Sequence, residues 1–292
     1  MKIAITGSHG MIGSALAPLL EGCGQDVVRL GRWPYSPETL DGADAVIHLA
    51  GENISGRWTK QRKGQIRESR VAGTRSLAEA IAMMPNPPKV LVSASAIGYY
   101  GDRGAETMIE EHGRGEGFLA EVCEAWEDAT APARRVHARV VNLRFGVVLS
   151  PAGGALARML PAFRAGLGGP LGDGGQYMGW IALADAVGVI QRALITRTLE
   201  GPVNAVSPYP VTNSEFTETL ARVIRRPARL WMPALAARIA FGEMADAVLL
   251  ASTRVEPIRL IATGYRFKYP VLEEALRHML EIPAGVHKEV AA

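Results

Sequence analysis

The chain has little cysteine and no long apolar run. Only two cysteines, Cys23 and Cys123, occur in 292 residues, which excludes a secreted disulfide framework. No uncharged apolar stretch reaches about 18 residues, so we expect no membrane span and no membrane partner. The opening Met1-Lys2 runs into a short apolar stretch broken by Gly7, which is not a signal-peptide pattern. These absences predict a soluble, cytoplasmic protein.

The chain also lacks a strong charge of either sign. Thirty-two Lys and Arg residues against 29 Asp and Glu leave a net charge of +3. The densest basic stretch, 57–63, has four cations at helical spacing and is interpreted as a solvated helix face. We therefore expect no nucleic-acid partner, and we also expect no metal site. The apolar fraction of 48% and charged fraction of 21% exclude disordered, collagenous and coiled-coil chains.

In the first half of the chain, short apolar runs alternate with helical periodicities. The patterns predict strands at 2–6, 26–30, 45–50, 89–93 and 139–149, and helices at 11–22, 59–83 and 118–131. Strands that alternate with helices imply a parallel sheet covered on both faces. The expected fold class is therefore α/β, with a doubly wound parallel sheet.

After residue 150 the composition of the chain changes. The segment 151–180 has nine glycines and three prolines around a helical stretch at 156–163, which is typical of loops near a ligand or of a linker. Later patterns predict a strand at 203–205 and helices at 183–197, 213–226, 234–252 and 271–281. We expect a cofactor-binding core at 1–150, to which 182–206 returns, and a smaller, mainly helical substrate lobe at 151–292.

A glycine motif follows the first predicted strand and opens the first helix. Gly7 permits a tight turn, Gly10 lets the backbone approach a diphosphate, and Gly13 lets the helix pack close to the strand. The amides of Met11 and Ile12 lie at the helix N-terminus, which favours a phosphate group. The alternative is an ordinary glycine turn.

The end of the second strand indicates which dinucleotide would bind. An NAD site usually has an Asp or Glu there, whereas this strand ends in Gly31 and Arg32. Gly31 leaves space and Arg32 can pair with a 2′-phosphate, which favours NADP(H). The alternative is that Arg32 is an exposed loop cation. After the third strand, the small residues 49–51 leave space for the adenosine half, and His48 is more typical of a satisfied strand-end histidine than of a ligand.

These motifs resemble a known family. The chain is similar to an extended-type short-chain dehydrogenase/reductase with a Rossmann core at Gly7-x-x-Gly10-x-x-Gly13, His48-Leu49-Ala50-Gly51 and Ser93-Ala94-Ser95. It resembles the atypical epimerase-family branch at Gly51-Glu52-Asn53-Ile54, Ser69-Arg70, Leu167-Gly168-Gly169-Pro170 and Ala262-Thr263-Gly264-Tyr265. Members of this branch have a small helical extension at the C-terminus and are labelled sugar-nucleotide epimerases, mainly because of their fold.

The resemblance implies a set of site residues and shows where the chain departs from it. The family uses a Ser, a Tyr and a Lys four residues after the Tyr, and Ser95 matches the serine. Leu119 and Cys123 occupy the usual Tyr and Lys positions, and neither can do that work. Arg70 stands where the family usually has an Asn near the cofactor. Val148 would contact the nicotinamide half through its backbone.

Other residues are candidates to replace the missing Tyr and Lys. Tyr99 and Tyr100 follow Ser95 closely, and either could donate a proton or serve in packing or substrate stacking. Cys123 is more typical of a small buried side chain than of a nucleophile. The polar residues 110–112 are expected to be solvated, and Asp185 is expected to be a helix-start residue.

Two functions remain open at this level. The first is an NADP(H)-dependent oxidoreductase or epimerase that acts on a small polar metabolite, either free or nucleotide-linked, with 166–175 and 178–181 lining its cavity. The second is a non-catalytic NADP(H)-binding regulatory protein, favoured by the loss of the Tyr and Lys. A methyltransferase is disfavoured because the second strand lacks a terminal acid. The oligomeric state is left open.

Overall fold

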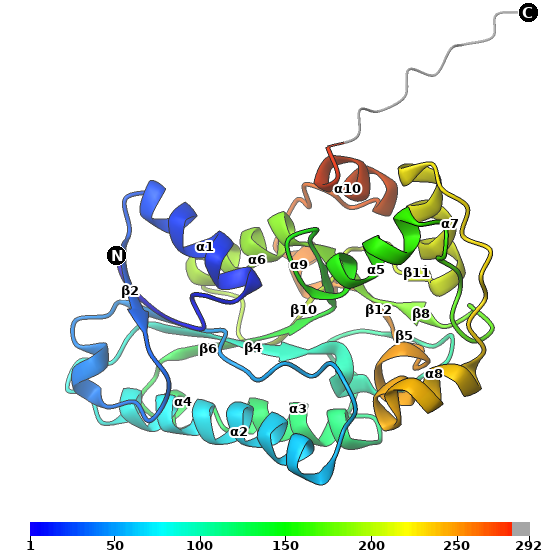
Figure 1. Ribbon diagram of the computed structural model, residues 1–292. Helices are drawn as coiled ribbons and strands as arrows, with labels where there is room; N and C mark the ends of the chain where they lie inside the picture. Colours follow the sequence, from blue (N-terminus) through cyan, green and yellow to red (C-terminus); the bar gives the residue numbers. More distant parts are fainter. Residues whose placement is uncertain (282–292) are drawn as a thin grey trace, which may run out of the picture.

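A six-stranded parallel sheet forms the centre of the protein, and the computed structural model describes residues 1–281 (Figure 1). The strand order is β10-β6-β4-β3-β1-β2. The strands are β1 (Lys2–Thr6), β2 (Asp26–Leu30), β3 (Ala45–His48), β4 (Val90–Ala96), β6 (Arg139–Phe145) and β10 (Gly201–Ala205). The inner strands β1, β3, β4 and β6 are rich in Val, Ile, Leu and Ala because both of their faces are buried, whereas the edge strand β2 is partly exposed. The doubly wound α/β fold is confirmed.

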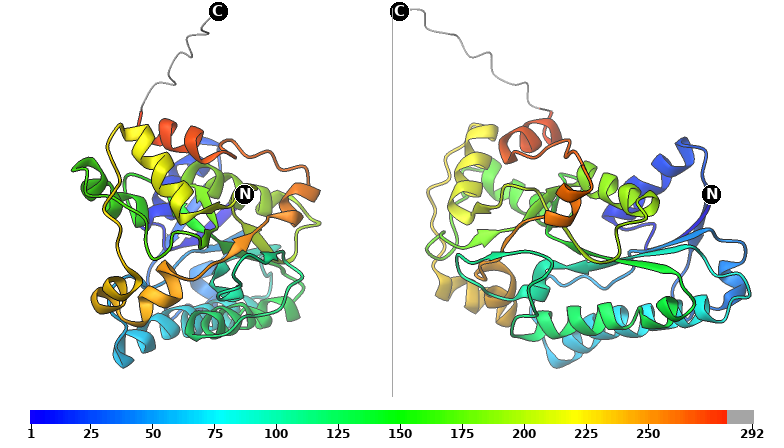
Figure 2. Two further views of the ribbon diagram at one scale, coloured as in Figure 1. Left: turned by 90° about the vertical axis from the view of Figure 1, so that its right-hand side faces the viewer. Right: turned by 180° about the vertical axis from the view of Figure 1, so that it is seen from behind.

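Helices cover both faces of this sheet (Figures 1 and 2). One face carries α1 (Met11–Gly22) and α6 (Leu183–Ile195), and the other carries α2 (Lys60–Ala82), α3 (Phe118–Asp128) and α4 (Ala131–Arg135). Leu16 and Ile190 pack with Ile5 in the first layer, and Leu77 packs with Leu91 in the second. The carboxyl ends of the strands are therefore held between two packed helical layers.

The remaining elements form a mainly helical part beside the carboxyl ends of the strands. Its helices are α5 (Gly154–Arg164), α7 (Asn213–Ile224), α8 (Ala234–Phe241), α9 (Ile258–Ala262) and α10 (Leu272–Met279). Three two-stranded pairs lie outside the main sheet, namely β7 (Val147–Leu149) with β9 (Trp180–Ala182), β8 (Tyr177–Met178) with β11 (Val211–Thr212), and β5 (Thr107–Met108) with β12 (Arg254–Val255). Trp180, Leu156 and Phe216 lie in its apolar core.

Asp185 joins this part to the core. Its carboxylate, on the first turn of α6, accepts hydrogen bonds from the backbone amides of Lys268 (2.6 Å) and Tyr269 (2.9 Å). The segment before α10 is thereby fastened to a helix that packs on the main sheet. Asp185 is indeed in the first helical turn, but its side chain holds a distant segment.

The predicted single strand at 139–149 is wrong at Gly146. A Cβ atom at Gly146 would lie 2.6 Å from the carbonyl oxygen of Gly179, so two backbones meet closely there. The chain leaves the main sheet at this point, and β7 pairs with β9 instead of extending β6. This break directs Val148 away from the central sheet.

Two predicted helices also end earlier than expected. The helix at 118–131 stops at Asp128, and Pro132 lies in the first turn of α4, where its missing N–H costs nothing. The helix at 234–252 stops at Gly242, whose φ of +63° ends α8 before a π-helical turn at Ala245–Leu249. Both predicted helices are too long, because local helix propensity does not show where these helices are interrupted.

The expectation that 110–112 is solvated is wrong for Glu110. Its side chain is 3% exposed and accepts hydrogen bonds from the amides of Asn204 (3.1 Å) and Arg259 (3.2 Å). Burial raises the pKa of this carboxyl group. Glu110 thus connects β10 to the start of α9, a role that depends on residues about 90 and 150 positions away.

Candidate cofactor-binding site

The turn after β1 is formed as the glycine spacing predicted. Gly7 has φ of +69°, and its carbonyl oxygen accepts a hydrogen bond from the amide of Gly10 (3.0 Å). A Cβ atom at Gly7 would lie 2.7 Å from the amide nitrogen of Ala50, and one at Gly13 would lie 2.3 Å from the Gly7 carbonyl oxygen. The packing of the chain itself therefore requires glycine at Gly7 and Gly13.

Gly10 is different, because little in the described chain requires a glycine there. A Cβ atom at Gly10 would meet only the Gly7 carbonyl oxygen, at 3.3 Å. Gly10 is the N-cap of α1, which has no side-chain cap and no acidic residue in its first turn. The first-turn amides, with those of Met11 and Ile12 among them, can therefore receive an external anion. The open space and free N–H groups fit a diphosphate.

Gly31 and Arg32 lie next to this turn. The last pair of the β1–β2 ladder is Thr6 with Leu30, so Gly31 and Arg32 follow directly beside the glycine turn. A Cβ atom at Gly31 would meet nothing within 4 Å. The Arg32 side chain is exposed and makes no hydrogen bond or ion pair with any residue in 1–281. It is free to pair with a phosphate, as the 2′-phosphate interpretation requires.

The residues at the end of β3 border the glycine turn that follows β1. The amides of Leu49 and Ala50 donate to the Thr6 hydroxyl at 3.2 and 3.3 Å. His48 is fully buried between the hydroxyl groups of Thr6 (2.6 Å) and Thr74 (2.9 Å). Burial lowers the pKa of His48 to about 4, so it is a neutral core residue. This agrees with the interpretation of a satisfied strand-end histidine.

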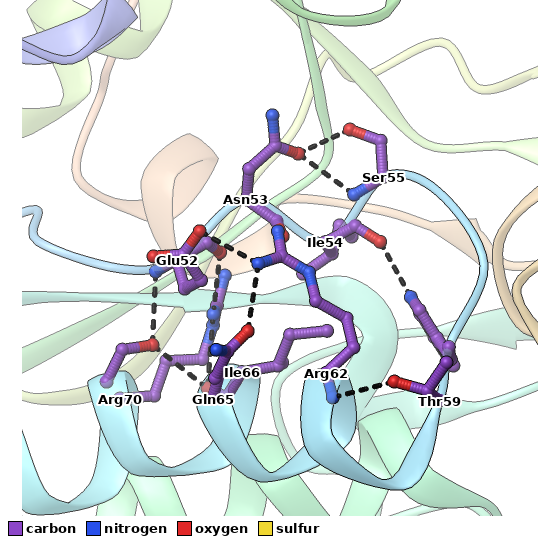
Figure 3. A network of polar contacts seen from close by, with 11 residues as sticks. Glu52, Asn53, Ile54, Ser55, Thr59, Arg62, Gln65, Ile66 and Arg70 are labelled. Carbon is purple, nitrogen blue, oxygen red and sulfur yellow. Dashed lines mark hydrogen bonds and ion pairs between the residues drawn. The ribbon is translucent and has the colours of Figure 1, made fainter.

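The loop after β3 is fastened to α2 by two arginines (Figure 3). Arg70 lies against Gly51 and donates to the carbonyl oxygen of Glu52 (2.9 Å). Arg62 forms an ion pair with the Glu52 carboxylate (3.0 Å) and also donates to the carbonyl oxygen of Asn53. Figure 3 shows both arginines reaching from α2 toward the loop. Because Arg70 is paired within the chain, it fixes the loop beside the glycine turn.

Val148 and Met11 meet at the start of α5. A Cβ atom at Gly154 would lie 3.2 Å from the Met11 sulfur and 3.5 Å from the Val148 carbonyl oxygen. The break at Gly146 therefore brings β7 toward the first turn of α1. The predicted cofactor residues, which come from five separate segments, thus gather near the carboxyl ends of the sheet strands.

Ser95 belongs to a buried polar network that includes an ion pair. Its hydroxyl donates to the Glu127 carboxylate (2.7 Å), which also receives two hydrogen bonds from Arg144 (2.8 and 2.9 Å). The side chains of Arg144 and Glu127 are 3% and 12% exposed. Burial alone would lower the pKa of Arg144, but the hydrogen bonds and charge of Glu127 outweigh it and raise the pKa. Ser95 is therefore held in one orientation.

Leu119 and Cys123 lie one turn apart on α3, beneath the short 3-10 helix Ile97–Tyr100. A Cβ atom at Gly98 would lie 3.3 Å from the Leu119 Cβ and 3.9 Å from the Cys123 sulfur. Cys123 is buried, and burial raises its thiol pKa to about 12. It is a small core side chain, as expected, and not a reactive thiolate.

The two candidate tyrosines, Tyr99 and Tyr100, differ in burial and in hydrogen bonding. Tyr100 is fully buried, donates to the Asn204 side chain (2.8 Å) and accepts from Arg144 (3.0 Å). Burial raises the pKa of Tyr100 to about 12. Tyr99 is half-buried, and the Arg144 guanidinium lies 3.5 Å from its ring centroid. The Tyr99 hydroxyl makes no hydrogen bond within 1–281, so of the two only Tyr99 has a free hydroxyl.

Sequence reasoning missed Glu127 and Arg144 as neighbours of Ser95. Strand register could have found Arg144, because Ser95 pairs with Arg144 and Arg144 pairs with Asn204 across three adjacent strands. Glu127 lies four residues after Cys123, on the same side of α3 as the Tyr and Lys positions. Among residues 1–281, no group of three or more His, Cys, Asp or Glu side chains could hold a metal, and no helix is long and apolar enough to cross a membrane.

Comparison with known proteins identifies the family. Residues 3–206 match the NAD dependent epimerase/dehydratase family, and 232–279 match a domain of unknown function (DUF1731). An epimerase family protein of Mycobacterium bovis is 43% identical over 96% of this chain and 98% of its own length. A crystal structure of the human epimerase family protein SDR39U1 with NADPH has a TM-score of 0.90 and 34% identity over 96% of this chain and 99% of that chain.

A crystal structure of a nucleoside-diphosphate sugar epimerase from Corynebacterium glutamicum has a TM-score of 0.77 and 37% identity over 96% of this chain and 58% of that chain. The resemblance found in the sequence motifs is confirmed by these matches, which span both the core and the C-terminal part. The chain belongs to the NAD dependent epimerase/dehydratase family.

Proposed function

We propose that the protein binds NADP(H) in the cytoplasm and acts as an oxidoreductase or epimerase on a small polar metabolite, either free or nucleotide-linked. The observation that carries the proposal is the open space at Gly10 beside the free Arg32 side chain. A diphosphate and a 2′-phosphate would occupy these two positions. The human relative crystallised with NADPH supports this choice of cofactor.

Each part of the cofactor has a counterpart in the chain. The amides that follow Gly10 would receive the diphosphate, and Arg32 would receive the 2′-phosphate. The backbone at 49–51 leaves space for adenosine. Arg70 and the backbone of Val148 would border the nicotinamide half. When bound, NADP(H) supplies or accepts the hydride, and the chain needs only to position a substrate and a proton.

Tyr99 is the residue that we propose as proton donor. Its hydroxyl is free within residues 1–281, and its ring is held under Arg144, which is itself fixed by Glu127. Ser95 is fixed by the same carboxylate and would orient the substrate. The hydroxyl of the buried Tyr100 already donates to Asn204 and accepts from Arg144, so Tyr100 supports the network instead.

Replacing Arg32 with alanine is expected to weaken NADPH binding by about 1.5–3 kcal/mol, roughly tenfold to a hundredfold, and to leave NADH binding unchanged. The difference arises because only NADPH has the 2′-phosphate. Titration calorimetry with both cofactors measures it, with Arg197→Ala, an exposed arginine after α6, as the matched control. Equal losses for NADPH and NADH would contradict the assigned role of Arg32.

The second candidate function is a non-catalytic NADP(H)-binding protein whose cofactor occupancy changes partner binding. The observation that favours it is that Leu119 and Cys123 fill the Tyr and Lys positions. Neither side chain offers a proton near neutral pH. The two candidates share the cofactor site, but the first turns over a substrate, whereas in the second the bound cofactor changes partner binding.

The Tyr99→Phe variant separates the two candidates. Wild-type protein is first screened for NADPH oxidation with carbonyl compounds and sugar nucleotides. If Tyr99 donates the proton, Tyr99→Phe lowers kcat by about 10²- to 10⁴-fold with NADPH affinity unchanged. Tyr209→Phe is the control, because Tyr209 is 60% exposed and is not part of the hydrogen-bonded network of Ser95, Glu127 and Arg144. Tight NADPH binding without turnover on any substrate would favour the non-catalytic protein.

A further inference from the structure

An exposed apolar stripe runs along α8 and the residues before it. Leu235 and Ile239 on α8 are each 66% exposed, and Trp231, which precedes α8, is 61% exposed although its indole N–H donates to the carbonyl oxygen of Gly172. Leu235 and Ile239 lie on one face of α8, while Ala237 on the opposite side is fully buried. We name these three residues the α8 stripe. Large apolar side chains grouped in this way indicate an interaction surface.

Neighbouring segments widen the surface. Leu230, 55% exposed, donates its amide to the carbonyl oxygen of Gly168 (3.1 Å), which places the 59%-exposed Leu167 beside it. A Cβ atom at Gly166 would lie 3.5 Å from the Pro227 ring, so the two loops are in contact. This surface lies at the end of the molecule opposite the N-terminus (Figures 1 and 2).

Arginines occur in the segment that leads from the end of α7 to the stripe, and on α8 itself. Arg225, Arg226 and Arg229 are exposed, and their side chains make no hydrogen bond or ion pair with any other residue in the described part of the chain. Arg238 lies between Leu235 and Ile239 and pairs with Asp246 (2.9 Å). The segment 225–239 therefore combines a net positive charge with exposed aliphatic and indole groups.

We propose that the α8 stripe and its arginines dock the protein on an anionic membrane surface. Apolar side chains with an indole among arginines are typical of segments that lie in the headgroup region. Arginines near such a surface attract anionic lipids. A second copy fits less well, because stripe-to-stripe pairing would bring the two sets of arginines together. The sequence expectation of no membrane partner rested on the lack of a spanning segment, whereas this contact is peripheral.

Vesicle flotation of the full chain tests the proposal. The probes are vesicles of phosphatidylcholine alone and of phosphatidylcholine with phosphatidylglycerol. We expect binding to the anionic vesicles to be at least about tenfold stronger and to weaken as salt is raised. The double variant Leu235→Glu, Ile239→Glu and the double variant Arg226→Glu, Arg229→Glu should each lower that binding about tenfold or more.

The matched control is Ile195→Glu, which changes a 68%-exposed residue at the end of α6 and should leave vesicle binding unchanged. Thermal melting of every variant confirms that the fold is retained. Absence of vesicle binding, equal binding to both vesicle types, or binding that survives both double variants would overturn the proposal. A dimer seen by light scattering and lost in Leu235→Glu, without vesicle binding, would assign the stripe to a second copy instead.

Discussion

Replacing Gly10 with valine is expected to abolish NADP(H) binding while the protein stays folded. The backbone of Gly10 has φ of −75°, which valine adopts without strain, and a Cβ atom there would touch only the Gly7 carbonyl oxygen. The valine methyl groups would instead occupy the space proposed for the diphosphate. We expect affinity to fall by roughly a hundredfold or more, about 3 kcal/mol, and stability to fall by about 1 kcal/mol or less.

Gly13→Ala is the informative comparison. Its Cβ would lie 2.3 Å from the Gly7 carbonyl oxygen and 2.7 Å from the Ser8 Cα, and neither backbone atom can move aside. This variant should lose about 1–3 kcal/mol of stability, with any loss of binding following from the distorted turn. Calorimetry and thermal melting therefore separate a ligand-facing glycine from a packing glycine. If Gly10→Val binds NADPH normally, the diphosphate lies elsewhere.

The turn from β1 into α1 could be predicted because its determinants are local. The strand, the three glycines and the helix follow one another within residues 2–22, and the structure has β1 and α1 at the expected bounds. The position of Arg32 followed from the same logic, since parallel strands end at one edge of the sheet. The roles of these residues in binding stay predictions until cofactor affinity is measured.

The features that could not be predicted depend on contacts between residues that are distant in the sequence. The break after β6 follows from the approach of Gly179 to Gly146, 33 positions apart, and no local pattern encodes it. Glu110 looked like a loop carboxylate because its partners lie in β10 and α9. To predict the pairing of Glu127 with Arg144, one would need to know the register of β4 with β6 and the side of α3 that faces these strands. Periodicity predicts elements well, but side-chain pairing across elements needs the packed fold.

The second large effect, a loss of stability, is expected on replacement of Arg144. Arg144→Met should destabilise the protein by about 3–5 kcal/mol, because it leaves the Glu127 carboxylate mostly buried without its cationic partner. Only the hydroxyl of Ser95 would still donate to that carboxylate from within the network. Tyr100 would lose one hydrogen bond and keep its contact with Asn204. Urea denaturation at neutral pH measures the loss.

The double variant Arg144→Met, Glu127→Gln tests whether charge, and not packing volume, is the cause. Methionine fills much of the arginine stem and glutamine keeps the shape of glutamate, so the pair removes both charges at nearly constant volume. Its stability should recover by at least about 1–2 kcal/mol relative to Arg144→Met alone. Additive losses would mean that the ion pair is not the stabilising contact. Recovery with weakened turnover but normal NADPH affinity would further indicate that the pair serves to position Tyr99 and Ser95.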